Sequence, residues 1–247
     1  MRRRTVANAK TVNWSTLDQY TLYSYFHSLG KKIVGKSLTP DQIQRLISKH
    51  LKPVLPIRIK KCIDPKICET YIYTGGMYHS YDDMKGRASI EVNFSYHPND
   101  TRLTLTAYRW TKLAKRFADV VLHEIIHMRQ FRARGFKNIP GYQSTAASGK
   151  ERKSQEYFGD TDEMGAFAFN IAQQMIDQFG YDPSAIKQYL DSNLARRRKT
   201  SWWYDYLNTF NWDHDHRIIR RMKQKVMRQL ENAYYGKPFK TTDWLTY

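Results

Sequence analysis

The chain contains few cysteines and no long apolar stretch. Its two cysteines, Cys62 and Cys68, stand in CIDPKIC, a spacing that fits neither a CxxC redox pair nor a four-cysteine zinc site. Two cysteines cannot form a disulfide framework. We therefore expect reduced thiols in an intracellular protein, with one loop-closing disulfide as the alternative. No run of 18 apolar residues occurs, so no membrane-spanning helix is expected.

Acidic residues are also scarce. The chain has 23 Asp+Glu against 41 Lys+Arg, which gives a net charge of +18 and a pI near 9.8. This excess favours contact with a polyanion such as nucleic acid, and an ordinary solvated basic surface is the alternative. The N-terminal stretch MRRRTVANAKTVNW lacks the apolar segment of a secretory signal. It predicts a cytoplasmic protein with a basic arm over residues 1–13 that becomes ordered on a partner.

A five-residue motif, HEIIH at positions 123–127, lies inside a predicted helix over residues 111–135. Apolar residues recur there at helical spacing, no proline intervenes and Gly135 ends the run. Two histidines four residues apart share one helix face, so His123 and His127 can bind one ion. Glu124 then lies beside the ion, where it can take a proton from bound water, as in the HExxH zinc peptidases called zincins. The alternative is a buried helix with two satisfied histidines, although each polar group would then need its own partner.

A catalytic zinc site normally has three protein ligands and one water. After His127 the next histidine is His214 and the next carboxylate is Glu151. The metzincin extension is excluded, because Gln130 and Ala133 stand where that subclass has glycine and histidine. The remaining candidates for the third ligand are Glu151, Glu156, Asp160, Asp162, Glu163, His214 and His216.

Glu163 is favoured among these candidates. Asp160 opens a predicted helix that ends at Gly180. On that helix Glu163 shares a stripe with Phe167 and Ile171, so its carboxylate points toward the core and needs a positive partner such as a metal ion. The alternative is a first-turn glutamate stabilised by the helix dipole.

These segments resemble known proteins. HEIIHMRQ, followed after an insert by YFGDTDEMGAFAFNIA, is similar to the gluzincin branch of zinc peptidases, and in particular to compact metallopeptidase-like proteins of phages and bacteria. The resemblance covers roughly residues 86–180. It implies that His123, His127 and Glu163 bind Zn²⁺, that Glu124 is the general base, and that a peptide or protein is the substrate. It also implies a phage setting, with incorporation into a virion.

The chain departs from the thermolysin pattern at one position. Phe167 stands where that pattern has an aspartate, four residues after the ligand glutamate. A carboxylate behind the metal ligands must then come from elsewhere, and Asp119 and Asp160 are the candidates, with a surface charge and a helix cap as their ordinary roles. Tyr157 is the candidate donor to the carbonyl oxygen, with Tyr142 behind it. A core or surface role is the alternative for both tyrosines.

Strand signals precede the motif. We expect strands over residues 57–63, 70–74 and 88–96, with a turn at Gly75 and Gly76 and a loop from 76 to 86. Residues 103–108 predict another strand or an extended lead into the helix that carries HEIIH. Strand 88–96 alternates apolar and polar residues and is the candidate edge for binding an extended peptide, with an interior strand as the alternative. Residues 136–154 predict a long functional or mobile loop. Helices are expected from a cap at Ser15 or Thr16 to Ser28, and from a cap at Thr39.

The C-terminal third is basic and aromatic. The basic run 196–199 is followed by the aromatic residues Trp202, Trp203 and Tyr204. Together they can bind nucleic acid, with the basic residues on phosphates and the rings on bases. Alternatively, the rings pack on the core and the arginines stay solvated. Residues 215–234 predict a basic amphipathic helix, and the tail ending in Trp244 and Tyr247 is expected to dock. The HDH segment at residues 214–216 is a weak metal signal. The side chains of His214 and His216 would point in different directions at the start of a helix.

Together these features predict an α+β, zincin-like fold. A small mixed or antiparallel sheet packs on the HExxH helix and on a second ligand-bearing helix, with extra helices at both ends. We expect a metallopeptidase domain over residues 14–180 and a helical extension over 181–247 that packs on the same core. The predicted function is zinc-dependent peptide hydrolysis. The alternatives are a structural or virion-associated protein with a vestigial or structural metal site, and a nucleic-acid-binding protein that uses the basic arm and the Arg196–Lys199 cluster.

Overall fold

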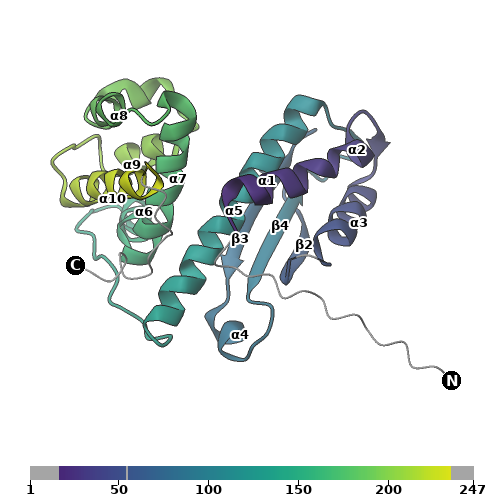
Figure 1. The fold of residues 1–247 in the computed structure, drawn as a ribbon, viewed down its shortest axis with the longest axis horizontal. Coiled ribbons are helices and arrows are strands. Elements are labelled where there is room, and N and C mark those ends of the chain that lie inside the picture. The colour runs from purple at the N-terminus through teal and green to yellow at the C-terminus, as the bar shows by residue number, and fades with distance from the viewer. Residues whose placement is uncertain (1–16, 54, 235–247) are drawn as a thin grey trace. The chain divides into compact units, whose positions relative to one another are not determined.

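The computed structural model describes residues 17–53 and 55–234 (Figure 1). The predicted basic arm, residues 1–13, and the tail residues Trp244 and Tyr247 lie outside these ranges. The chain divides into two compact units, Met1–Met128 and Arg129–Tyr247. The predicted domains, residues 14–180 and 181–247, stay predictions. Within the described ranges, no helix is long and apolar enough to cross a membrane.

The first unit combines helices with two small sheets, so the α+β class is confirmed at this coarse level. The last helix, α5, begins in this unit and continues five residues into the second. The elements of the first unit are α1 (Gln19–Ser28), α2 (Gly30–Ile33), β1 (Ser37–Leu38), α3 (Pro40–Leu51), β2 (Ile57–Ile63), β3 (Ile72–Tyr78), α4 (Ser80–Met84), β4 (Ile90–Tyr96), β5 (Leu103–Thr104) and α5 (Ala107–Ala133).

The larger sheet has the order β2-β4-β3, with β2 parallel and β3 antiparallel to β4. The alternation predicted for strand 88–96 is confirmed, since Ile90, Val92, Phe94 and Tyr96 are buried. The expectation that this strand is an edge is wrong, because β4 pairs on both sides. The edges of this sheet are β2 and β3.

The turn predicted at Gly75 and Gly76 is also wrong, because both glycines lie inside β3. Gly76 faces α5, where an added Cβ would stand only 2.7 Å from Val120 Cγ1. The glycine is therefore needed for the close approach of strand and helix rather than for a turn. The loop predicted from 76 to 86 contains the short helix α4.

Stacked aromatic rings form the core between α1, α5 and β4. The Phe26 ring lies 4.4 Å from Phe117, 4.9 Å from Trp110 and 5.9 Å from Phe94, measured between centroids.

The helix predicted after Thr39 is confirmed as α3, with a capping box between Thr39 and Gln42. The predicted cap positions of the first helix, Ser15 and Thr16, lie outside the described residues, and the Asp18 side chain caps α1.

The regular elements that the structure describes in the second unit are all helices. The loop predicted over residues 136–154 is wrong for its last residues, because Ser148 caps a helix that begins at Gly149. This helix lacks clear apolar periodicity. The predicted amphipathic helix is confirmed, with Ile218, Met222 and Val226 buried in a core shared with α7 and α9. The elements are α6 (Gly149–Gly159), α7 (Thr161–Phe179), α8 (Pro183–Leu190), the 3-10 helix η1 (Asn193–Arg197), α9 (Trp202–Thr209) and α10 (Arg217–Tyr234).

Candidate metal centre

The long helix α5 carries the HEIIH motif in its second half. His123, Glu124 and His127 are all buried, with 8%, 7% and 8% of their surfaces exposed. The two imidazole rings lie on one side of the helix, with centroids 4.7 Å apart and planes inclined by 76°. Both histidines therefore face the same small region, as their four-residue spacing predicts.

The Glu124 side chain lies against the edge strand β3. An added Cβ on Gly76 would stand 2.8 Å from both Cγ and Oε1 of Glu124. The carboxylate consequently occupies the space that a side chain at position 76 would fill. This contact also places Glu124 beside a strand that has no second strand partner among the described residues.

The first turn of α7 carries Glu163. Asp160 caps this helix by accepting hydrogen bonds from the backbone N–H groups of Asp162, at 2.8 Å, and Glu163, at 3.4 Å. Burial raises the pKa of the Asp160 carboxyl, and these two backbone hydrogen bonds oppose the rise. Of the two roles considered for Asp160, the structure shows the helix cap.

The C-terminal end of α5 holds the first turn of α7 in place. Gln130 Nε2 donates to the Asp162 carbonyl oxygen at 3.1 Å. Both Nη atoms of Arg134 donate to the two Asp162 carboxylate oxygens, each at 2.6 Å, and the side chains are only 10% and 13% exposed. A buried bidentate pair of this kind fixes direction as well as distance. Sequence reasoning missed these residues, although Gln130 and Arg134 follow His127 by three and seven residues and so share its helix face.

His123, His127 and Glu163 come together. Each offers one ligand atom, and the three atoms lie within 4.8 Å of one another. Two imidazole nitrogens and one carboxylate oxygen form a donor set that suits zinc, whose tetrahedral geometry places ligand atoms roughly 3.4 Å apart. The residues fit the metal that the motif implies.

The other candidate ligands have different surroundings, and none joins a metal-binding group of three within residues 17–53 and 55–234. Glu151 accepts hydrogen bonds from Gln155 and Asn211. Burial lowers the pKa values of His214 and His216, and His214 Nε2 lies 3.2 Å from Asn193 Oδ1. Glu156 lies on α6, outside the group.

The two tyrosines proposed as donors differ in their surroundings. Tyr157 on α6 is 47% exposed, and its ring lies edge-on to Phe158 and Phe167. Tyr142 packs against Gly159, where an added Cβ would meet its ring at 2.3 Å, so it has a packing role. Asp119, the other carboxylate considered behind the ligands, accepts a hydrogen bond from Gln19 Nε2 at 2.6 Å.

A third phenol was not anticipated. The Tyr206 hydroxyl on α9 is fully buried, and no described residue gives it a hydrogen-bond partner. Burial raises its pKa well above the ordinary value, with further contributions from the negative charges of Glu163 and Asp160. It therefore stays protonated. The sequence offered no signal for this, because the aromatic spacing on α9 predicts only a core residue.

The aromatic residues after the run 196–199 mostly serve packing. Trp203, Tyr206 and Phe210 are buried, so the interpretation that these rings pack on the core is confirmed. The Arg196 guanidinium lies 4.4 Å from the centre of the Trp212 ring.

Comparison of the chain with protein-family models, with curated proteins and with solved structures finds no match.

Proposed function

We propose that this chain is a zinc-dependent metallopeptidase of the gluzincin type. His123, His127 and Glu163 hold the zinc ion, and Glu124 is the general base. The observation that supports this function is the convergence of two buried imidazoles and one half-buried carboxylate, whose ligand atoms lie within 4.8 Å of one another, beside the buried Glu124.

The chemistry is the hydrolysis of a peptide bond. A bound zinc ion would lower the pKa of its water and polarise the carbonyl of the substrate. Glu124 takes a proton from the water and delivers it to the leaving amine. Tyr157, on the exposed side of α6, is the residue assigned to donate to the carbonyl oxygen.

The edge strand β3 is the proposed support for the substrate, in place of strand 88–96. Its sequence, IYTGGMY, carries no charge and includes Gly76, which lies against Glu124. The opposite edge, β2, carries Arg58, Lys60 and Lys61, charges that discourage strand addition. An extended peptide that pairs with β3 would run beside the general base and be held through its backbone.

Two measurements test this function. Purified protein should contain about one zinc per chain, and His123→Ala and Glu163→Gln should each lose most of it. Glu156→Gln, a glutamate change on α6 outside the ligand group, is the matched control and should keep the metal. Zinc-free protein with intact fold, or unchanged zinc in both ligand variants, would refute the metal site.

Hydrolysis is tested on quenched fluorescent peptides with and without a chelator. Glu124→Gln should keep zinc and lose hydrolysis, while Glu156→Gln should leave the rate unchanged. Undiminished hydrolysis by Glu124→Gln contradicts the mechanism. Zinc retained by a chain that cleaves no peptide would favour a structural or vestigial site.

A further inference from the structure

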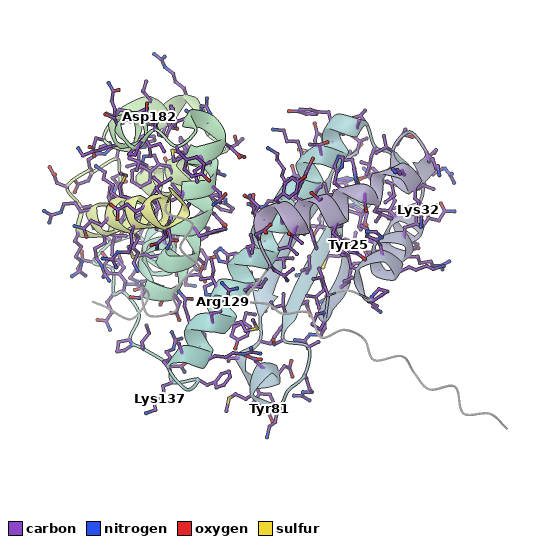
Figure 2. The ribbon with its side chains drawn as sticks, viewed as in Figure 1. Tyr25, Lys32, Tyr81, Arg129, Lys137 and Asp182 are labelled. Carbon is purple, nitrogen blue, oxygen red and sulfur yellow. The ribbon has the colours of Figure 1, made fainter. Side chains whose placement is uncertain are left out.

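A pocket of about 320 Å³ lies at the C-terminal end of α7, where this helix meets α8 and η1. Its size is at the lower end of the range for small-molecule sites. Asp182, labelled in Figure 2, caps α8, the helix that forms one wall of the pocket. Glu163 and Gln178 are 15 residues apart on α7, so the pocket lies roughly 22 Å along the helix from the candidate ligand.

The apolar part of the pocket is aromatic. The rings of Phe179 and Tyr189 lie 5.2 Å apart between centroids, with planes inclined by 52°. Leu194 belongs to the same lining and is 47% exposed. Tyr189 is only 4% exposed and supports the half-buried Phe179 ring, which together with Leu194 offers the apolar surface that can receive the face of another ring.

The polar part of the lining is basic. Arg197 and Arg198 line the pocket, and none of its lining residues is acidic. Arg198 Nη1 donates to Gln178 Oε1 at 2.7 Å, which orients this guanidinium and leaves its other N–H groups available. The exposed side chain of Arg197 makes no hydrogen bond or ion pair with any residue of the described ranges. Two guanidinium groups that line one pocket favour a phosphate, which guanidinium groups bind through paired N–H donors.

We propose that this pocket binds one nucleotide of a single-stranded nucleic acid. The base lies on the half-buried Phe179 ring, the adjacent phosphates lie on Arg197 and Arg198, and the exposed Gln188 amide faces the edge of the base. The net charge of +18 supplies the long-range attraction for a polyanion. A duplex hides the faces of its bases, so an aromatic pocket favours a single strand over a duplex. This binding goes beyond the proposed peptidase activity and does not depend on it.

The test is the binding of a fluorescent single-stranded 12-mer of thymidine, measured by anisotropy in the full-length chain at several salt concentrations. Arg197→Ala should weaken binding several-fold at low salt and reduce the salt slope by about 0.7, the value for one phosphate contact on a single strand. Ala185→Phe on α8 fills the pocket without changing charge. It should weaken binding about ten-fold, through loss of stacking, and leave the salt slope unchanged.

Two controls make the outcome decisive. Lys150→Ala with Lys153→Ala removes two exposed charges on α6, outside the pocket, and should have less effect on binding than Arg197→Ala. A duplex 12-mer should bind Ala185→Phe and the unmodified chain alike. The site is refuted if Ala185→Phe, with an unchanged melting curve, binds the single strand normally. Equal losses for the lysine control and Arg197→Ala, or an equal effect of Ala185→Phe on the duplex, would also refute it.

Discussion

The close packing of Gly76 against Glu124 gives a sharp test of the proposed site. In Gly76→Ala, the new Cβ would lie 2.7 Å from Val120 Cγ1 and 2.8 Å from Glu124 Oε1. Ordinary contact begins at 3.4 Å, so these atoms must move apart by about 0.7 Å, the difference between 3.4 and 2.7 Å. Overpacking of this size destabilises a protein by about 1–3 kcal/mol. A shift of the general base approaching 1 Å costs up to about 100-fold in rate.

Gly75→Ala is the matched control, because it adds the same methyl group to the neighbouring position of the same strand. An added Cβ at position 75 meets nothing within 4 Å, so stability should change by less than about 0.5 kcal/mol. Urea unfolding measures the free energy of unfolding for both variants, and peptide hydrolysis with zinc present measures the rate. The reasoning fails if Gly76→Ala unfolds at the same urea concentration as Gly75→Ala, or if the two hydrolyse peptide equally fast.

Two further perturbations act within the second unit. Arg134→Ala removes the bidentate partner of Asp162, and because this pair is nearly buried we expect a loss of about 2–4 kcal/mol in the free energy of unfolding. The exposed Lys137→Ala serves as its control in urea unfolding, and equal midpoints would contradict the role of the pair. Burial, with repulsion from neighbouring arginines, lowers the pKa of Lys225 from 10.5 to about 8. The unfolded chain therefore binds more protons between these two values, and stability should rise with pH across that window. Lys225→Met should abolish the rise and add on the order of 1–2 kcal/mol at pH 7; a variant that keeps the rise would show that another group causes it.

Local signals predicted several elements correctly. Thr39 with Pro40, Asp160 and Gly180 marked helix ends that the structure confirms, since caps depend on neighbouring backbone groups. The alternation of β4 was equally reliable, because burial of one sheet face imposes a two-residue period. Helix spacing also predicted that His123 and His127 share one face, and their rings lie 4.7 Å apart between centroids.

Features set by tertiary contacts could not be predicted in the same way. Gly75 and Gly76 resemble a turn in sequence, and only the approach of α5 explains a glycine inside β3. Strand order depends on pairing partners, which the alternation of β4 does not reveal. Helix α6 lacks an apolar stripe, so its only local sequence signal is the capping residue Ser148.

The position of β4 between its two neighbours has a consequence for the order of folding. The nearest β3–β4 pair, Tyr78 with Ile90, closes a loop of about 12 residues, whereas every β2–β4 pair, such as Ile57 with Ile90, closes one of about 33. The longer closure costs about 0.9 kcal/mol more in chain entropy. Strands β3 and β4 should therefore associate early, and β2 should join last. Destabilising changes in β2 should mainly speed unfolding, while changes in the β3–β4 pair should slow folding.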